Sequence, residues 1–193
     1  MNVRLDFLTG QKPNFRLRSY KKNTKYVLYT TQIQIHPFVS ILLAVRNEES
    51  CILSCLEFID ELDYPNNLYE VLIGNDDSTD ESRQLIAKFI EGKANFYLFD
   101  IDQKHSQTKG KANVLAQLAQ KAKGDFYFFT DADTHVPKTW IKAILKEFQA
   151  QTGIVVGVTS LYSSSFFATQ QAIDWLFVLS LIKTSTDKGI PVT

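Results

Sequence analysis

Asp131 and Asp133, two carboxylates separated by one residue, are the side chains of this sequence best suited to hold a metal ion. They follow an apolar stretch of strand length, residues 125–130, so both can face one cleft at the end of a buried strand. Mg²⁺ and Mn²⁺ take oxygen ligands and usually bind one or two carboxylates together with substrate phosphates. Such a metal would neutralise a departing diphosphate. The alternative is an Asp-rich turn before a helix that begins at Pro137, and this short motif alone does not decide between the two.

Polar side chains also follow two other apolar stretches. One group is Arg46-Asn-Glu-Glu49, and the other is Asn75-Asp-Asp-Ser-Thr-Asp80. Acids at strand ends accept hydrogen bonds from the ribose or the base in other nucleotide-binding folds, and one of the adjacent acids Asp76 and Asp77 suits this role. Asp77 and Ser78 also suit the cap of the following helix, and that interpretation stays open.

Lys109-Gly110-Lys111 precedes the start of an expected helix, where backbone amides and lysine charge favour a phosphate. A solvated pair of lysines is the alternative. His135 lies two residues after Asp133; we interpret it as a surface histidine rather than a further metal ligand. The sequence contains no GxxxxGK[ST] phosphate loop.

Cys51 and Cys55 are the only cysteines of the chain. Their spacing of four places them on one face of an expected helix, and there is no second pair to complete a structural zinc site. We therefore expect two reduced, half-buried thiols, which suits a cytosolic compartment.

The elements that must position these residues alternate along the chain. Continuous apolar runs predict strands over residues 38–45, 69–74, 95–99, 125–130 and 153–159. Helical spacing, a capping-box pattern at Ser78 and a helix-starting proline predict helices over residues 49–62, 78–91, 111–123, from 137 onward and 166–182. This alternation predicts an α/β fold, a mostly parallel sheet with helices on both faces. Ligands bind such sheets at the carboxyl ends of the strands, which is where the polar clusters lie.

The chain of 193 residues has 45% apolar and 22% charged residues, which suits one globular domain. Residues 1–37 carry seven basic side chains against the single acid Asp6, so we separate a basic arm, 1–37, from a domain, 38–193. Such an arm suits an anionic membrane surface or a solvated terminus. We see no signal peptide and no run of roughly 18–20 apolar residues. We therefore expect a soluble fragment, and no nucleic-acid partner.

Four motifs in this order and spacing resemble the family 2 glycosyltransferases. The matching stretches lie within about residues 38–160 and are 39–49, 71–80, 109–113 and 124–133. The resemblance implies the GT-A fold, a Rossmann-like sheet. The Lys109-Gly-Lys-Ala-Asn113 form looks most like membrane-associated members that build polysaccharides or glycolipids. The resemblance to these members implies a protein at the cytoplasmic face of a membrane.

The resemblance also implies roles for individual residues. The nucleotide-sugar pocket would be formed by Ala44, Arg46, Glu48, Asp76, Lys111 and Asp131, and the Mg²⁺ or Mn²⁺ ion would be held by Asp133 and Asp131. The implied reaction is inverting: an acceptor hydroxyl, on a saccharide or a lipid, attacks the anomeric carbon of a nucleotide-diphospho-sugar. UDP is the donor nucleotide most common in the family.

The sequence departs from the family pattern in two places. Asn75 replaces the first acid of the second motif, and Asp77 replaces its glycine. The general base of the family, an acid in a Glu-Asp pair, would lie beyond Thr193, so we expect a C-terminally truncated domain in which residues 175–182 form an interfacial helix or face the missing half. A non-catalytic nucleotide-sugar-binding fragment is the alternative. A receiver-like domain is disfavoured because its paired acids follow the first strand, and a nucleotidyltransferase because a Gly-rich loop is lacking there.

Overall fold

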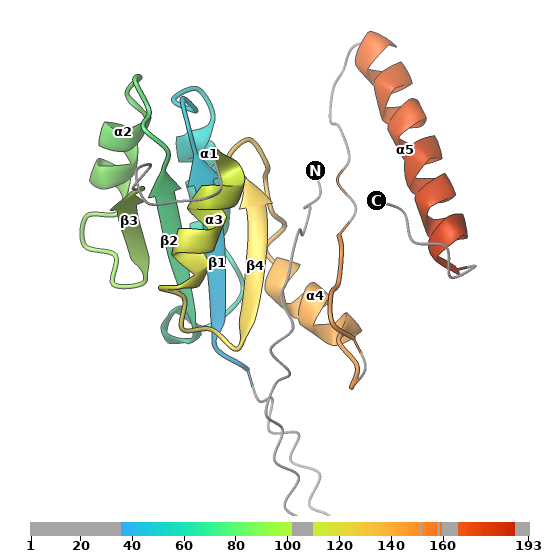
Figure 1. Ribbon diagram of the computed structural model, residues 1–193, viewed down its shortest axis with the longest axis horizontal. Coiled ribbons are helices and arrows are strands. Elements are labelled where there is room, and N and C mark those ends of the chain that lie inside the picture. The colour runs from blue at the N-terminus through green and yellow to red at the C-terminus, as the bar shows by residue number, and fades with distance from the viewer. Residues whose placement is uncertain (1–35, 102–109, 151, 158, 160–165, 188–193) are drawn as a thin grey trace, which may run out of the picture.

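The computed structural model describes residues 36–101, 110–150, 152–157, 159 and 166–187. Within them the chain forms one four-stranded sheet of order β3-β2-β1-β4, in which every pairing is parallel. The strands are β1 (Val39–Val45), β2 (Tyr69–Asn75), β3 (Phe96–Asp100) and β4 (Phe126–Asp131). The expected α/β architecture with a parallel sheet is confirmed (Figure 1).

Helices cover both faces of this sheet (Figure 1). The described residues form α1 (Ile52–Asp60), α2 (Ser82–Phe89), α3 (Lys111–Ala119), α4 (Trp140–Glu147) and α5 (Phe166–Asp187), with a short 3₁₀ turn, η1 (Asn66–Leu68), before β2, and the first four of these helices pack on the sheet. One apolar cluster joins β1 to α1, α2 and α4, and a second joins the sheet to α3. Successive side chains of β1 point to opposite faces of the sheet, and this explains the division. Its odd-numbered residues, such as Leu43, enter the first cluster, and its even-numbered Leu42 enters the second.

Gly74 allows α3 to lie close to β2. A Cβ atom built on Gly74 would lie 2.4 Å from a methyl carbon of Val114 in α3 and 3.1 Å from the side chain of Ile101. A larger side chain would therefore push the helix away from the strand end that carries the predicted site.

A buried carboxylate fixes the opposite edge of the sheet, where the strands begin. Glu70, 3% exposed, accepts hydrogen bonds from the Ser40 hydroxyl (2.7 Å) and from the Lys123 amide (2.7 Å). The Gly124 amide in turn donates to the Ser40 hydroxyl (2.8 Å). This network joins the starts of β1 and β2 to the turn before β4, and it satisfies polar groups that would otherwise be buried without partners.

The fifth strand, predicted over residues 153–159, is wrong for the described part of that range: 152–157 and 159 carry no strand. Ile154 and Val156 are 44% and 64% exposed. An apolar run forms a strand only when another strand satisfies its backbone groups, and within the described residues nothing pairs here.

Several helices begin later than predicted. The Ser78 hydroxyl accepts a hydrogen bond from the Asn47 amide, so it does not cap a helix there, and α2 begins at Ser82. Pro137 lies in a turn, where its carbonyl oxygen accepts a hydrogen bond from the Trp140 amide, and α4 begins at Trp140.

The helix α5 stands away from the sheet in Figure 1. Its exposed apolar side chains include Ile173 (60%), Phe177 (65%) and Leu181 (52%). No helix among the described residues is long and apolar enough to cross a membrane. The basic arm lies almost wholly outside the described residues, so the predicted division between arm and domain stays a prediction.

Candidate nucleotide-sugar site

The strand register brings three of the predicted motifs together at the carboxyl edge of the sheet. Ala44, the penultimate residue of β1, pairs with Gly74 on one side and with Asp131 on the other. One residue further on, Asn75 of β2 pairs with Asp100 of β3. The residues that follow β1, β2 and β4 therefore leave the sheet side by side, as the sequence predicts.

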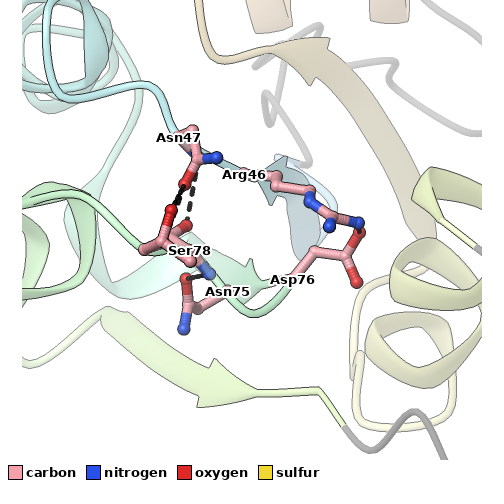
Figure 2. Close-up of polar contacts among 6 residues, drawn as sticks. Arg46, Asn47, Asn75, Asp76 and Ser78 are labelled. Carbon is pink, nitrogen blue, oxygen red and sulfur yellow. Dashed lines mark hydrogen bonds and ion pairs between the residues drawn. The ribbon is translucent and has the colours of Figure 1, made fainter.

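Side chains of Asn47 and Ser78 join the loop after β1 to the loop after β2 (Figure 2). The Asn47 carbonyl oxygen accepts from the amide of Thr79 (2.8 Å) and from its hydroxyl (3.3 Å). The Ser78 hydroxyl accepts from the Asn47 amide at 3.2 Å. These bonds connect residues more than thirty positions apart and fix the two loops relative to each other.

A second set of hydrogen bonds extends this junction to the starts of α1 and α2. The buried Ser82 hydroxyl accepts from the Glu48 amide (2.8 Å), and the Asp80 carboxylate accepts from the Glu49 amide (3.1 Å). Glu49 returns a bond by accepting from the Glu81 amide at 3.0 Å. The two loops thus form one hydrogen-bonded platform beside the strand ends.

Arg46 and Asp76 face each other across this platform, as Figure 2 shows. The Arg46 guanidinium lies 3.6 Å from the Asp76 carboxylate; the Asp76 side chain is 5% exposed and that of Arg46 62%. A buried carboxylate needs a charged or hydrogen-bonding partner, and this arginine supplies one from the solvent side. The pair presents an acceptor and a cation at the place where the sequence predicts a nucleotide.

Asn75, the first departure from the family motif, acts together with Asp100. Its amide nitrogen donates to Asp100 (3.0 Å), and its carbonyl oxygen accepts from the Ser78 amide (3.3 Å). Arg83 binds Asp100 through two hydrogen bonds of 2.8 Å, and the bonds from Arg83 and then Asn75 lower the pKa of Asp100. An acid at position 75 would place two carboxylates in contact, so an amide is the compatible partner here.

Asp77, the second departure, has a φ of 56°. This left-handed conformation is the one that glycine adopts freely, and aspartate and asparagine tolerate it better than most residues. Asn47 has the same conformation, with φ of 55°. The replacement of glycine by Asp77 therefore preserves the path of the loop.

Asp131 and Asp133 lie at the end of β4, as predicted. Asp131 is half-buried and accepts a hydrogen bond from the Lys111 ammonium at the start of α3, while Asp133 is exposed. Among the described residues no group of three or more His, Cys, Asp and Glu side chains suits a metal ion. Two carboxylates are nevertheless the hard oxygen donors that Mg²⁺ or Mn²⁺ takes when phosphates and waters complete its shell. The residues fit such an ion, and the metal site stays a prediction.

Glu48 lies between the end of β1 and the start of α1, where its carboxylate accepts from the Cys51 thiol at 3.1 Å. Burial first, then the hydrogen bond and charge of Glu48, and last the charge of Asp133 raise the pKa of Cys51 to about 11. Burial and the charge of Cys51, followed by those of Asp133 and Asp131, raise the pKa of Cys55 to about 12. Both thiols are free and protonated near neutral pH, and they show that Glu48 and the two aspartates share one acidic neighbourhood.

Sequence reasoning missed the contact that holds the loop after β4. His135 is half-buried, its Nε2 atom lies 2.9 Å from the Ser54 hydroxyl, and its ring stacks on Phe58 with centroids 4.3 Å apart. Ser54 and Phe58 are one helical turn apart on α1, and this spacing was the available signal. The interpretation of His135 as a surface histidine is wrong, because its ring is half-buried and packs against α1.

A hollow of about 490 Å³ lies elsewhere, near the starts of β2 and β3. It is lined by residues that include Asn66, Lys93 and Asn95, and by none of the predicted site residues. The motifs converge at the opposite edge, so the predicted nucleotide site and this hollow are separate places. Lys109 of the third motif lies outside the described residues.

Comparison with known proteins agrees with this geometry. A beta-monoglucosyldiacylglycerol synthase from Nostoc sp. is 33% identical over 115 residues, 60% of this chain and 24% of that protein. A poly-beta-1,6-N-acetyl-D-glucosamine synthase from Staphylococcus aureus is 30% identical over 150 residues, 76% of this chain and 35% of that protein. The crystal structure of S. aureus TarS 1-349 superimposes with a TM-score of 0.50 at 24% identity, covering 56% of this chain and 31% of that one.

The likeness to TarS shows the fold, which is GT-A as the motif resemblance implies. The chain spans about a quarter to a third of the length of the relatives it matches. The model of the family described as glycosyl transferase family 2 matches residues 40–191, which is most of the chain. This match shows that the chain belongs to glycosyl transferase family 2.

Proposed function

We propose that the protein transfers a sugar from a nucleotide-diphospho-sugar to a saccharide or lipid acceptor, and that residues 38–193 form its donor-binding part. The observation that carries this proposal is the convergence of the Arg46–Asp76 pair and the Lys111–Asp131 pair at one edge of a parallel sheet. Each pair joins an acceptor of hydrogen bonds to a cation, and a nucleotide with a diphosphate needs both.

The charges suggest how the donor lies. Asp76 would accept a hydrogen bond from the base, with Ala44, Arg46 and Glu48 lining the same pocket. The diphosphate would lie near Lys111, where the N-terminal amides of α3 add partial positive charge. Asp131 and Asp133 repel phosphate unless a cation lies between them.

A divalent metal is therefore part of the proposal. Asp133, which is exposed, would be the direct ligand of Mg²⁺ or Mn²⁺, with Asp131 beside it. The ion, when bound, would act as a Lewis acid that stabilises the departing diphosphate. Inverting transfer, by attack of an acceptor hydroxyl on the anomeric carbon, belongs to the same proposal.

The names of the relatives support the acceptor class. One is named for a glucosylated diacylglycerol and another for an N-acetylglucosamine polymer. We therefore propose a lipid or a saccharide acceptor and an activity at the cytoplasmic face of a membrane, with a UDP-sugar as donor. The alternative is a fragment that binds nucleotide-sugar without turnover.

The first test is calorimetric titration with UDP, GDP and dTDP, with and without Mn²⁺, of wild type, Asp133→Asn and Asp125→Asn. Asp125 is an exposed acid before the same strand, at the opposite edge, and serves as the matched control. We expect Mn²⁺-dependent binding of one nucleotide to wild type and to Asp125→Asn, and its loss in Asp133→Asn.

A folded sample that binds none of these nucleotides would contradict the proposed donor site. Equal binding by Asp133→Asn and wild type would contradict the metal assignment. Release of free UDP when the protein is incubated with a UDP-sugar would show turnover and exclude the alternative of binding alone.

A further inference from the structure

The contact between Lys111 and Asp131 joins the start of α3 to the end of β4 at the carboxyl edge of the sheet. Lys111 is the first residue of α3, which follows Gly110 (φ of 62°), and Asp131 is the last residue of β4. The Lys111 ammonium binds the Asp131 carboxylate, with side-chain exposures of 50% and 35%. A cation thus already lies on one of the two carboxylates that fit a divalent metal.

The surroundings explain why a cation is held there. Asp131, Asp133 and Glu48 all contribute negative charge to the neighbourhood of Cys55, where each raises the pKa of the thiol. Like charges gathered in a partly desolvated place repel one another, and a counter-ion relieves that repulsion. Lys111 supplies it from a flexible stem whose ammonium can move to another anion.

We propose that Lys111 is a resident counter-ion that competes with the divalent metal for Asp131 and moves to the diphosphate when the donor binds. The metal and the nucleotide then bind with positive coupling, because the nucleotide offers Lys111 a new partner and leaves Asp131 to the metal. By linkage, the metal strengthens nucleotide binding by the same factor. The half of this proposal that concerns the nucleotide rests on the proposed function; the half that concerns the metal does not.

The strength of an exposed ion pair suits such a role. Pairs of this kind change an equilibrium by up to about fivefold, which is enough to weaken metal binding and too little to prevent it. A buried ion pair would keep the carboxylate from binding the metal, and a distant lysine would have no effect on metal binding.

The test measures free Mn²⁺ by electron paramagnetic resonance, without nucleotide, in titrations of wild type, Lys111→Met and Lys111→Arg. Lys121→Met is the control, because Lys121 lies beyond the other end of α3 and its ammonium is 5.0 Å from the Phe99 ring. We expect Lys111→Met to bind Mn²⁺ about three- to fivefold more tightly than wild type. Lys111→Arg and the control should bind it no more tightly than wild type.

Titration with the nucleotide diphosphate provides the second readout. In wild type Mn²⁺ should strengthen nucleotide binding, and in Lys111→Met this enhancement should shrink while nucleotide binding itself weakens. Mn²⁺ affinity in Lys111→Met that is equal to or below that of wild type, or too weak to measure, would overturn the proposal. So would tighter Mn²⁺ binding by Lys111→Arg.

The outcomes separate this inference from the proposed function. Tighter Mn²⁺ binding by Lys111→Met in a protein that binds no nucleotide would support the counter-ion role and contradict the donor site. Metal-dependent nucleotide binding without any change of Mn²⁺ affinity in Lys111→Met would support the donor site and contradict the counter-ion role.

Discussion

Asp77 lies in the left-handed region of the backbone, and substitutions there should follow backbone conformation rather than charge. Its φ of 56° costs a β-branched side chain more than it costs aspartate, and glycine adopts it freely. We expect Asp77→Gly to keep the stability of wild type within about 1 kcal/mol, since released strain offsets the added entropy of the unfolded chain. Asp77→Val should lose about 1–2 kcal/mol.

Urea unfolding of both variants, compared with wild type, checks this expectation. A valine variant as stable as wild type would show that the loop does not hold the left-handed conformation in solution. Glu81 is a useful control position, because it lies in the same loop, is exposed and has a φ of −77°; Glu81→Val should change stability less than Asp77→Val does.

Individual site residues differed in how far the sequence could predict them. The position of Asp76, Asp131 and Lys111 at one edge of the sheet could be predicted, because these residues lie at strand ends or at the start of a helix and parallel topology brings such positions together. Asn47 and its bonds to Thr79 were not found, because a contact between two loops depends on the turn each loop takes. The Asn75–Asp100 bond was hidden for a related reason: the register of β2 and β3 cannot be read from either strand alone.

Close packing of α3 on β2 gives a test of how the layers fit. Gly74→Ala would place a methyl carbon 2.4 Å from Val114, so the helix or its side chain must shift. We expect a loss of about 1–3 kcal/mol from this overpacking. Because the obstructing atom belongs to a side chain, Val114→Ala should relieve the clash, and the double variant should be more stable than the sum of the two single changes predicts.

Chemical denaturation of the two single variants and the double variant measures this coupling. Losses that simply add would mean that α3 moves as a body when Gly74 is replaced, rather than yielding at Val114. Gly153→Ala is the matched glycine control, because nothing lies within 4 Å of a Cβ atom there and its φ is outside the left-handed region.

Strands were predicted more closely than helix starts, and the difference has a physical reason. The run predicted over residues 38–45 became β1 (Val39–Val45) because both of its faces are buried, which leaves a continuous apolar signal. Helix starts depend on which groups satisfy the first amides. At α2 the Asp80 carboxylate, and not Ser78, accepts from the backbone amide of Ser82 at 3.0 Å. The run at 153–159 looked like a strand, but its fate depended on a pairing partner that sequence does not reveal.

The stability of the entire domain should fall in acid, in part through the bridge from α2 to β3. Hydrogen bonds from Arg83 and Asn75 lower the pKa of Asp100 below its unfolded value of about 3.9. A carboxylate whose pKa is lower in the folded state contributes stability that is complete above about pH 4 and is lost as the pH falls through the folded pKa.

Arg83→Met should therefore have a lower urea midpoint than wild type at pH 7, and the two midpoints should converge as the pH falls below 4. Lys138→Met is the control, because the Lys138 ammonium forms an ion pair of 3.2 Å with Glu61 between two well-exposed side chains. A difference between Arg83→Met and wild type that persists undiminished in strong acid would exclude the Asp100 bridge as its source.

The central position of β1 has a consequence for synthesis of the chain. Val39 pairs with Tyr69 on one side, but on the other side it pairs with Phe126, which follows it by 87 positions. At about 5–20 residues per second, a ribosome needs roughly 4–17 s to deliver that partner. During this interval the nascent sheet has β1 as an apolar edge, the kind of edge on which strands of other chains can add. Codons that speed elongation between residues 46 and 125 should shorten this exposure, and slow codons in the same stretch should increase dependence on chaperones.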